Sequence, residues 1–130
     1  MAAAPESPKG DLMLRTLAMP ADTNPAGDIF GGWLLSQMDI AGGIAAKQRS
    51  RGRVATVAVD SMTFHKPVFV GDVLCCYANI ERVGNTSLTI RLQAWVIREA
   101  HAGERVKVTE GLFTFVAIGE DRRPRSVQST

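Results

Sequence analysis

The chain has 130 residues, of which 45% are hydrophobic and 22% are charged, and its formal net charge is +2. This size and composition predict one globular domain with enough apolar side chains to form a core. The small net charge and the aromatic content of 6% argue against a nucleic-acid-binding surface, so no nucleic-acid partner is expected.

The two ends of the chain are predicted to lie outside the folded part. Residues 1–10, rich in Ala and Pro, are expected to form a disordered tail, and residues 128–130 a second, shorter tail. Residues 11–127 are then predicted to form a single domain. Within it, Asp11–Met19 is expected to be a strand, and Pro20–Asp28, which is dense in Pro, Asn, Asp and Gly, a loop.

A helix is predicted next, from about Phe30 to Arg49. Asp28 is a candidate N-cap or first-turn acid, and Lys47 and Arg51 lie near the other end, where cations suit the helix dipole. The apolar residues of this segment fall on all sides of the helix. That pattern predicts a buried helix wrapped by the rest of the chain.

Asp39 is the one charged residue between Ile29 and Ala46. A lone carboxylate among apolar neighbours is costly if it is buried and unpaired, so a function or an internal hydrogen bond should explain it. The same segment is the only candidate for a membrane span. Its four glycines and its polar residues make a span of about 20 mainly apolar residues improbable, and none is expected.

The rest of the chain alternates between strands and turns. Leu88, Ile90 and Leu92 alternate with polar residues, which is typical of a half-buried strand. Trp95, on the nominally outer face of that strand, favours self-association. These patterns predict an α+β fold with an antiparallel sheet around one central helix. The expected strands are Arg53–Phe64, Asp72–Val83, Thr86–Glu99 and Arg105–Ile118, with Gly84 and Asn85 forming a hairpin turn.

The two cysteines, Cys75 and Cys76, are neighbours and would point to opposite faces of a strand. They are expected to be reduced thiols, and the N-terminal stretch lacks the pattern of a secretory signal, so a cytoplasmic location is expected. The two cysteines and the two distant histidines lack the spacing of a zinc site, and no metal is expected.

Three stretches together resemble hotdog-fold acyl-CoA thioesterases of the YciA type: "LRTLAMPADTNPAGDIFGGWLLSQMD", "GRVATVAVDSMTFHKPVFVGDVLCCYANIERVGNTS" and "KVTEGLFTFVAI". The resemblance implies the hotdog fold, in which an antiparallel sheet wraps one long helix. It also implies homodimers made by joining two sheets, commonly assembled as a hexamer of three dimers. The implied reaction is hydrolysis of acyl-CoA to free CoA and a carboxylic acid, without a cofactor.

Thioester hydrolysis needs a group that activates water and donors that stabilise the oxyanion. By resemblance Asp39 is the catalytic carboxylate, as a general base or as a nucleophile. Gly31 and Gly32 lie where the helix starts, so their N–H groups have no partner within the helix and could bind the oxyanion; loop geometry alone is the alternative. Asn24 could donate a second hydrogen bond, although Asn also favours turns by itself.

Spacing places these groups too far apart for one subunit. Asp39 follows Gly32 and Gly31 by seven and eight residues, which is ~10–12 Å along one helix. One carbonyl group cannot contact both Asp39 and the glycines of the same chain. We therefore predict an active site at a dimer interface, which combines Asp39 of one subunit with Asn24 and the glycines of its partner.

The CoA phosphates need cations or N–H donors. Lys66 is the first candidate, and Arg53 is a weaker one, for which a solvated surface charge is an equal alternative. His65 could line the CoA channel, or be merely exposed or structural. The full predicted CoA set is Lys66, His65, Arg82, Asn85, Thr86 and Ser87, and the acyl pocket is predicted to include Met38, Val57 and Met62.

Two rival functions use the same fold. An enoyl-thioester dehydratase should carry a histidine base near the helix, and neither His65 nor His101 is close to it in sequence. A non-catalytic acyl-CoA-binding protein is the second alternative. Regulators of that kind carry a DNA-binding module ahead of the domain, and only about ten residues precede the first expected strand here.

Overall fold

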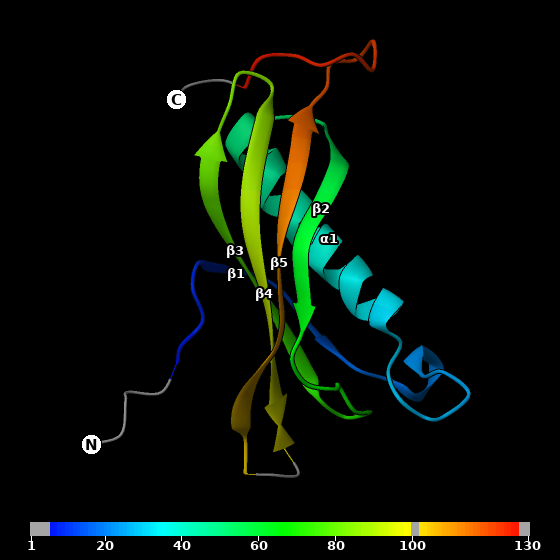
Figure 1. Ribbon diagram of the computed structural model, residues 1–130. Coiled ribbons are helices and arrows are strands. Elements are labelled where there is room, and N and C mark those ends of the chain that lie inside the picture. Colours follow the sequence, from blue (N-terminus) through cyan, green and yellow to red (C-terminus); the bar gives the residue numbers. More distant parts are fainter. Residues whose placement is uncertain (1–5, 100–101, 128–130) are drawn as a thin grey trace.

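The computed structural model describes residues 6–99 and 102–127. Its five strands form one antiparallel sheet, and the long helix α1 (Gly31–Ser50) lies across one face of that sheet (Figure 1). The order in the sheet is β1-β3-β4-β5-β2, which leaves β1 and β2 at the edges. The strands are β1 (Asp11–Leu17), β2 (Val54–Phe64), β3 (Val73–Val83), β4 (Ser87–Arg98) and β5 (Glu104–Ala117), and η1 (Pro20–Asp22) is a short 3-10 turn.

The predicted α+β class and the five predicted strands are confirmed, each strand within about two residues of its expected bounds. The β3–β4 hairpin also turns where it was expected, with the Gly84 N–H donating to the Ser87 carbonyl at 2.7 Å. Residues 1–5 and 128–130, parts of the two predicted tails, lie outside the described residues.

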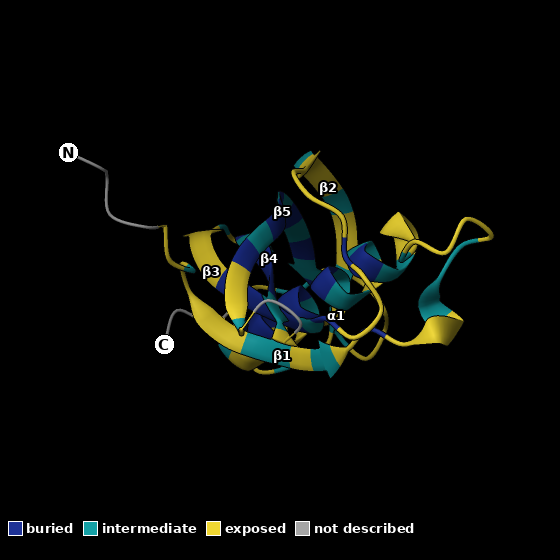
Figure 2. Cartoon of the chain, turned by 90° about the horizontal axis from the view of Figure 1, so that it is seen from below, coloured by how far each residue is buried: buried dark blue, intermediate teal, exposed yellow. Residues whose placement is uncertain are grey.

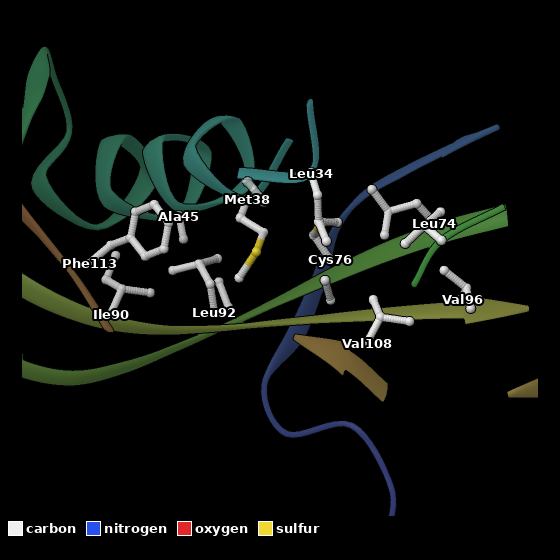
Figure 3. Close-up of a cluster of buried hydrophobic side chains, with 14 of the residues drawn as sticks. Leu34, Met38, Ala45, Leu74, Cys76, Ile90, Leu92, Val96, Val108 and Phe113 are labelled. Atoms are coloured by element: carbon white, nitrogen blue, oxygen red, sulfur yellow. The ribbon is translucent and has the colours of Figure 1, made fainter. Parts of the chain in front are cut away.

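The core lies between α1 and the sheet. Alternate residues of β4, from Leu88 to Val96, are fully buried, as the sequence pattern predicts. Figure 3 shows Leu34 and Met38 pointing from α1 toward β3, β4 and β5. The α1 helix is thus fixed to the sheet by apolar contacts along one of its sides.

The prediction that α1 is buried on all sides is wrong for the single chain. Ile40 is 49% exposed and Ile44 is 38% exposed, and buried and exposed positions alternate along the helix (Figure 2). The physical reason is that this sheet covers only one side of α1. The predicted role of Asp28 is also wrong: Phe30 is the N-cap residue, no acidic residue lies in the first turn, and Asp28 belongs to the loop before it.

The outer face of the sheet, opposite α1, does not support the prediction that Trp95 favours self-association. Trp95 is only 4% exposed in the single chain, because it packs against Cys75 and Tyr77. The backbone N–H of Lys9 donates to Gln93 Oε1 at 3.1 Å, so the segment before β1 also lies on this face. Trp95 is therefore satisfied within the chain and gives no support for self-association.

The two cysteines behave as expected. Both are buried and free; Cys76 lies in the core and Cys75 in the cluster on the opposite face. Burial, helped by the nearby Cys75, raises the pKa of Cys76 to about 12. The Cys76 thiol therefore stays protonated at neutral pH and is a poor nucleophile.

Two adjacent glycines of α1 should respond oppositely to alanine. A Cβ at Gly42 would lie 2.7 Å from the Phe115 ring, whereas a Cβ at Gly43 would meet nothing within 4 Å. We expect Gly42→Ala to lower the free energy of unfolding by about 1–3 kcal/mol through overpacking. Gly43→Ala should raise it by up to about 1 kcal/mol, because alanine favours the helix. Urea unfolding of both variants checks the pair, and equal shifts would contradict the close packing at Gly42.

Candidate active site

Asp39 lies on the partly exposed side of α1, and its carboxylate has a hydrogen-bond partner. The Thr56 hydroxyl, from β2, donates to Asp39 Oδ1 at 2.5 Å. A pocket of about 330 Å³ opens beside this pair, lined by Gly32, Leu35, Ser36, Asp39, Thr56, Val59 and Phe113. The carboxylate is therefore neither isolated nor unpaired. We call this space the Asp39 pocket.

The start of α1 presents backbone donors to a ligand. The first helical hydrogen bond is from the Leu34 N–H to the Phe30 carbonyl at 3.3 Å, so the N–H groups of Gly31 and Gly32 precede the helical ladder. A Cβ at Gly32 would contact nothing within 4 Å, and one at Gly31 only the Phe64 ring, at 3.8 Å. Neither N–H has a partner within the helix, and the helix dipole favours negative charge there.

A second pocket, of about 300 Å³, adjoins this helix end. We call it the Gly31 pocket. It brings Gly31 together with His65 and Lys66, two of the residues predicted to bind CoA; the full lining is Ile29, Phe30, Gly31, Leu34, Phe64, His65, Lys66, Pro67 and Val68. The sequence argument that no histidine lies near the helix is therefore wrong for His65, because the chain after β2 returns to the start of α1.

Asn24 has the turn-forming role that the sequence left open. Its side-chain oxygen accepts hydrogen bonds from the N–H groups of Ala26, at 3.0 Å, and Asp28, at 3.1 Å. These two bonds fix the orientation of the amide, since only the oxygen can accept. The Nδ2 group of Asn24 then remains as the donor of this side chain.

The other predicted CoA residues lie at the opposite end of the molecule. Arg82 lies one residue before the end of β3, Asn85 and Thr86 lie in the β3–β4 turn, and Ser87 begins β4, near the C-terminal end of α1 (Figure 1). Asn85 and Thr86 have structural partners there, since Asn85 Oδ1 accepts from Ser126 Oγ at 3.1 Å and the Thr86 carbonyl accepts from the Ala117 N–H at 2.8 Å. Within one chain the predicted CoA set is therefore split between two ends.

The predicted acyl-pocket residues do not line the Asp39 pocket. Met38 is fully buried between α1 and the sheet (Figure 3), and Met62 packs against the core. Val57 is 58% exposed on β2. The sequence instead missed Thr56 and Val59, which share the pocket although they are three residues apart on a strand; a register shift between Thr56 and Ala58 breaks the two-residue alternation.

Among residues 6–99 and 102–127, no three His, Cys, Asp or Glu side chains lie close enough together to hold a metal ion. Within the same residues, no helix is both long enough and apolar enough to cross a membrane.

Comparisons with known proteins agree with the geometry. The family model of the thioesterase superfamily matches residues 26–99. The acyl-CoA thioester hydrolase YciA of Escherichia coli is 57% identical over 122 residues, covering 92% of both chains. A hexameric thioesterase from Yersinia pestis is 56% identical with a TM-score of 0.90, covering 95% of this chain and 100% of its own. An acyl-CoA hydrolase from Staphylococcus aureus, solved with butyryl coenzyme A and coenzyme A, is 27% identical with a TM-score of 0.80. The match covers 88% of this chain and 69% of the hydrolase chain.

Proposed function

This chain belongs to the thioesterase superfamily and is a hotdog-fold acyl-CoA thioester hydrolase of the YciA type, and from that membership we propose how it cleaves its substrate. Asp39 of one subunit acts on a thioester whose carbonyl oxygen is bound by Asn24 and the start of α1 of a partner subunit. The observation that carries this proposal is the Thr56-bound carboxylate of Asp39, which opens into a pocket. No cofactor is required. A thiol-release assay across acyl-CoA substrates of different chain length tests the activity itself.

The order of chemical events follows from these groups. Asp39 accepts a proton from a water molecule, and the hydroxide attacks the thioester carbon. The N–H of Gly31 or Gly32, with Asn24 Nδ2, stabilises the oxyanion. Collapse of this tetrahedral intermediate breaks the carbon–sulfur bond, and the CoA thiolate takes the proton that Asp39 accepted from water. Direct attack by Asp39, through an anhydride that water then opens, uses the same residues.

Solved variants of a relative support the choice of residues. For the Staphylococcus aureus hydrolase, structures exist with one asparagine replaced by alanine and with one aspartate replaced by alanine. The two substituted positions are separated by the same number of residues as Asn24 and Asp39 in this chain. This spacing supports Asn24 and Asp39 as a functional pair.

The cross-subunit arrangement is supported by distance and by exposed apolar surface. Gly32 and Asp39 line the same pocket but are seven residues apart on α1, or ~10.5 Å along its axis, which is more than the width of one carbonyl group. The sheet ends in the free edge of β2, where Val57 is 58% exposed and Val59 is 40% exposed. Free apolar strand edges favour pairing with another chain.

We propose that two copies pair their β2 strands antiparallel about a two-fold axis. The exposed side of α1, with Ile40 and Ile44, then meets the partner. The helices become antiparallel, so the start of one α1 approaches Asp39 of the other. Further association of such dimers into a hexamer is supported by the Yersinia pestis thioesterase, which is hexameric.

Thr56 is proposed to position Asp39. Its hydroxyl fixes Oδ1, which leaves Oδ2 for water. We expect Thr56→Val to lower kcat about tenfold with KM little changed, because loss of one charged hydrogen bond costs roughly 1.5 kcal/mol.

Thr56→Ser is the matched control, because it keeps the hydroxyl and should retain most of the activity. The separate values of kcat and KM distinguish positioning from packing: Thr56→Val should lower kcat with KM little changed, and Thr56→Ser should leave both near the wild-type values. Equal losses of activity in both variants would refute the assignment.

A further inference from the structure

Ser36 is a polar side chain of the Asp39 pocket to which the proposed reaction gives no role. It lines this pocket together with Gly32, Asp39 and Thr56. On α1 it follows Gly32 by four residues and precedes Asp39 by three, so the three residues form one stripe along the helix. The Ser36 hydroxyl and the Asp39 carboxylate therefore face the same space.

The Ser36 hydroxyl is oriented by its own helix. Ser36 Oγ lies 2.7 Å from the Trp33 carbonyl oxygen. A carbonyl oxygen can only accept a hydrogen bond, so the proton of the hydroxyl points to Trp33. The Ser36 oxygen keeps its lone pairs for a donor in the pocket, where it serves as an acceptor.

Asp39 presents a second acceptor to the same space. The Thr56 hydroxyl donates to Oδ1 at 2.5 Å, which leaves Oδ2. Ser36 and Asp39 cannot satisfy each other, because both offer lone pairs. Side chains three residues apart on a helix have Cβ atoms about 5–6 Å apart, which is about twice the length of one O–H···O bond. That spacing suits one small molecule with two O–H donors.

Ser36 is not placed to attack the substrate itself. A serine nucleophile must pass its proton to an adjacent base. The Ser36 proton points instead to the Trp33 carbonyl, which cannot take it, and Asp39 accepts its printed hydrogen bond from Thr56. The geometry thus fits binding of a reactant by Ser36 rather than covalent chemistry.

We propose that Ser36 and Asp39 together bind the water molecule that attacks the thioester, an inference that rests on the proposed function and deepens it. The water donates one O–H to Asp39 Oδ2 and the other to Ser36 Oγ, which leaves an oxygen lone pair for the thioester carbon. Asp39 takes the first proton as the carbon–oxygen bond forms and passes it to the CoA thiolate. The second proton stays on the carboxylic acid product. With Oδ2 engaged by water, direct attack by Asp39 is disfavoured.

Ser36→Ala removes this acceptor. We expect kcat for acyl-CoA to fall about five- to tenfold, with KM changed by less than about twofold, because one hydrogen bond to the attacking water is lost. Ser36→Thr is the matched control, since threonine keeps the oxygen and can also bond back to the helix. It should retain most of the wild-type kcat. Thermal unfolding of both variants should show a Tm close to that of the wild type.

Competition between water and methanol separates water binding from a structural role. Methanol has a single O–H, which it donates to Asp39, so it makes no use of Ser36. Its attack gives the acyl methyl ester and CoA, with Asp39 again taking the proton. At one methanol concentration, the ratio of ester to acid should therefore rise about fivefold in Ser36→Ala and stay at the wild-type value in Ser36→Thr. A change in helix packing would slow both reactions equally and leave the ratio unchanged.

Single-turnover assays with excess enzyme test the order of events. If water attacks the thioester, Ser36→Ala slows the first release of thiol by the same factor as kcat. In direct attack by Asp39, the thiol leaves before water is needed, so its first release would not change. An unchanged first release, an unchanged ester-to-acid ratio, or complete loss of activity, which would indicate a serine nucleophile, each overturns the inference. A wild type that releases no thiol would instead refute the proposed function, and this inference with it.

Discussion

Replacing Asp39 with asparagine is expected to lower kcat for acyl-CoA hydrolysis by about 10²–10⁴-fold, the usual contribution of a positioned acid–base group. The amide has nearly the same shape and can still accept the hydrogen bond from Thr56. It can neither take a proton from water nor attack a carbonyl. The change therefore removes the chemistry of the carboxylate and keeps its contacts, and steady-state thiol release with a saturating acyl-CoA measures it.

The control for this variant is a second carboxylate-to-amide change. Glu104 is the exposed first residue of β5. The change Glu104→Gln removes the same charge as Asp39→Asn, and the kcat of this variant should equal that of the wild type. Thermal unfolding of Asp39→Asn should show a Tm close to that of the wild type, because the amide keeps the hydrogen bond from Thr56. If Asp39→Asn keeps more than about a tenth of the wild-type kcat, Asp39 is not the catalytic group.

The sheet could be predicted from sequence because its signals are local. In β4 each core residue is followed by one on the other face, and this alternation alone fixes which side faces α1. The helix was harder to interpret. Its exposed residues, Ile40 and Ile44, are as apolar as its buried ones, so composition cannot separate contact with the sheet from contact with another subunit.

The candidate site was only partly predictable for a related reason. Gly31 and Asp39 belong to one continuous motif, whereas Thr56 comes to Asp39 from β2. The register shift after Thr56 is set by pairing with β5 and leaves no mark in the two-residue pattern of β2. His65 was misjudged because distance in sequence was taken for distance in space.

The split of the predicted CoA residues has a simple explanation in the proposed dimer. Lys66 lies at one end of the molecule, and Asn85 and Thr86 lie at the other. Antiparallel pairing of β2 places these opposite ends of two subunits side by side. A substrate would then meet predicted CoA residues of both subunits, and a monomer would lack part of that set as well as half of the proposed catalytic site.

Mixing two inactive variants should restore activity if the site spans two subunits. Asp39→Ala and Asn24→Ala are each expected to lose at least about 10²-fold in kcat. In a mixed dimer, one of the two sites receives Asp39 from one subunit and Asn24 from the other, and is intact. Random pairing of equal amounts makes about half of the dimers mixed, so the mixture should recover about a quarter of the wild-type activity.

A second mixture controls for effects of co-assembly. Asn24→Ala and Gly31→Val both alter the oxyanion half of the site, so every site in their mixed dimers keeps one defect and no activity should return. The Cβ atom of the new side chain fits at Gly31, since it would lie 3.8 Å from its nearest neighbour, the Phe64 ring. Co-expression of each pair, followed by thiol-release assays, compares the two mixtures directly. Recovery in neither mixture would show that Asp39 and Asn24 act within one chain, which the two helical turns between Gly32 and Asp39 make difficult.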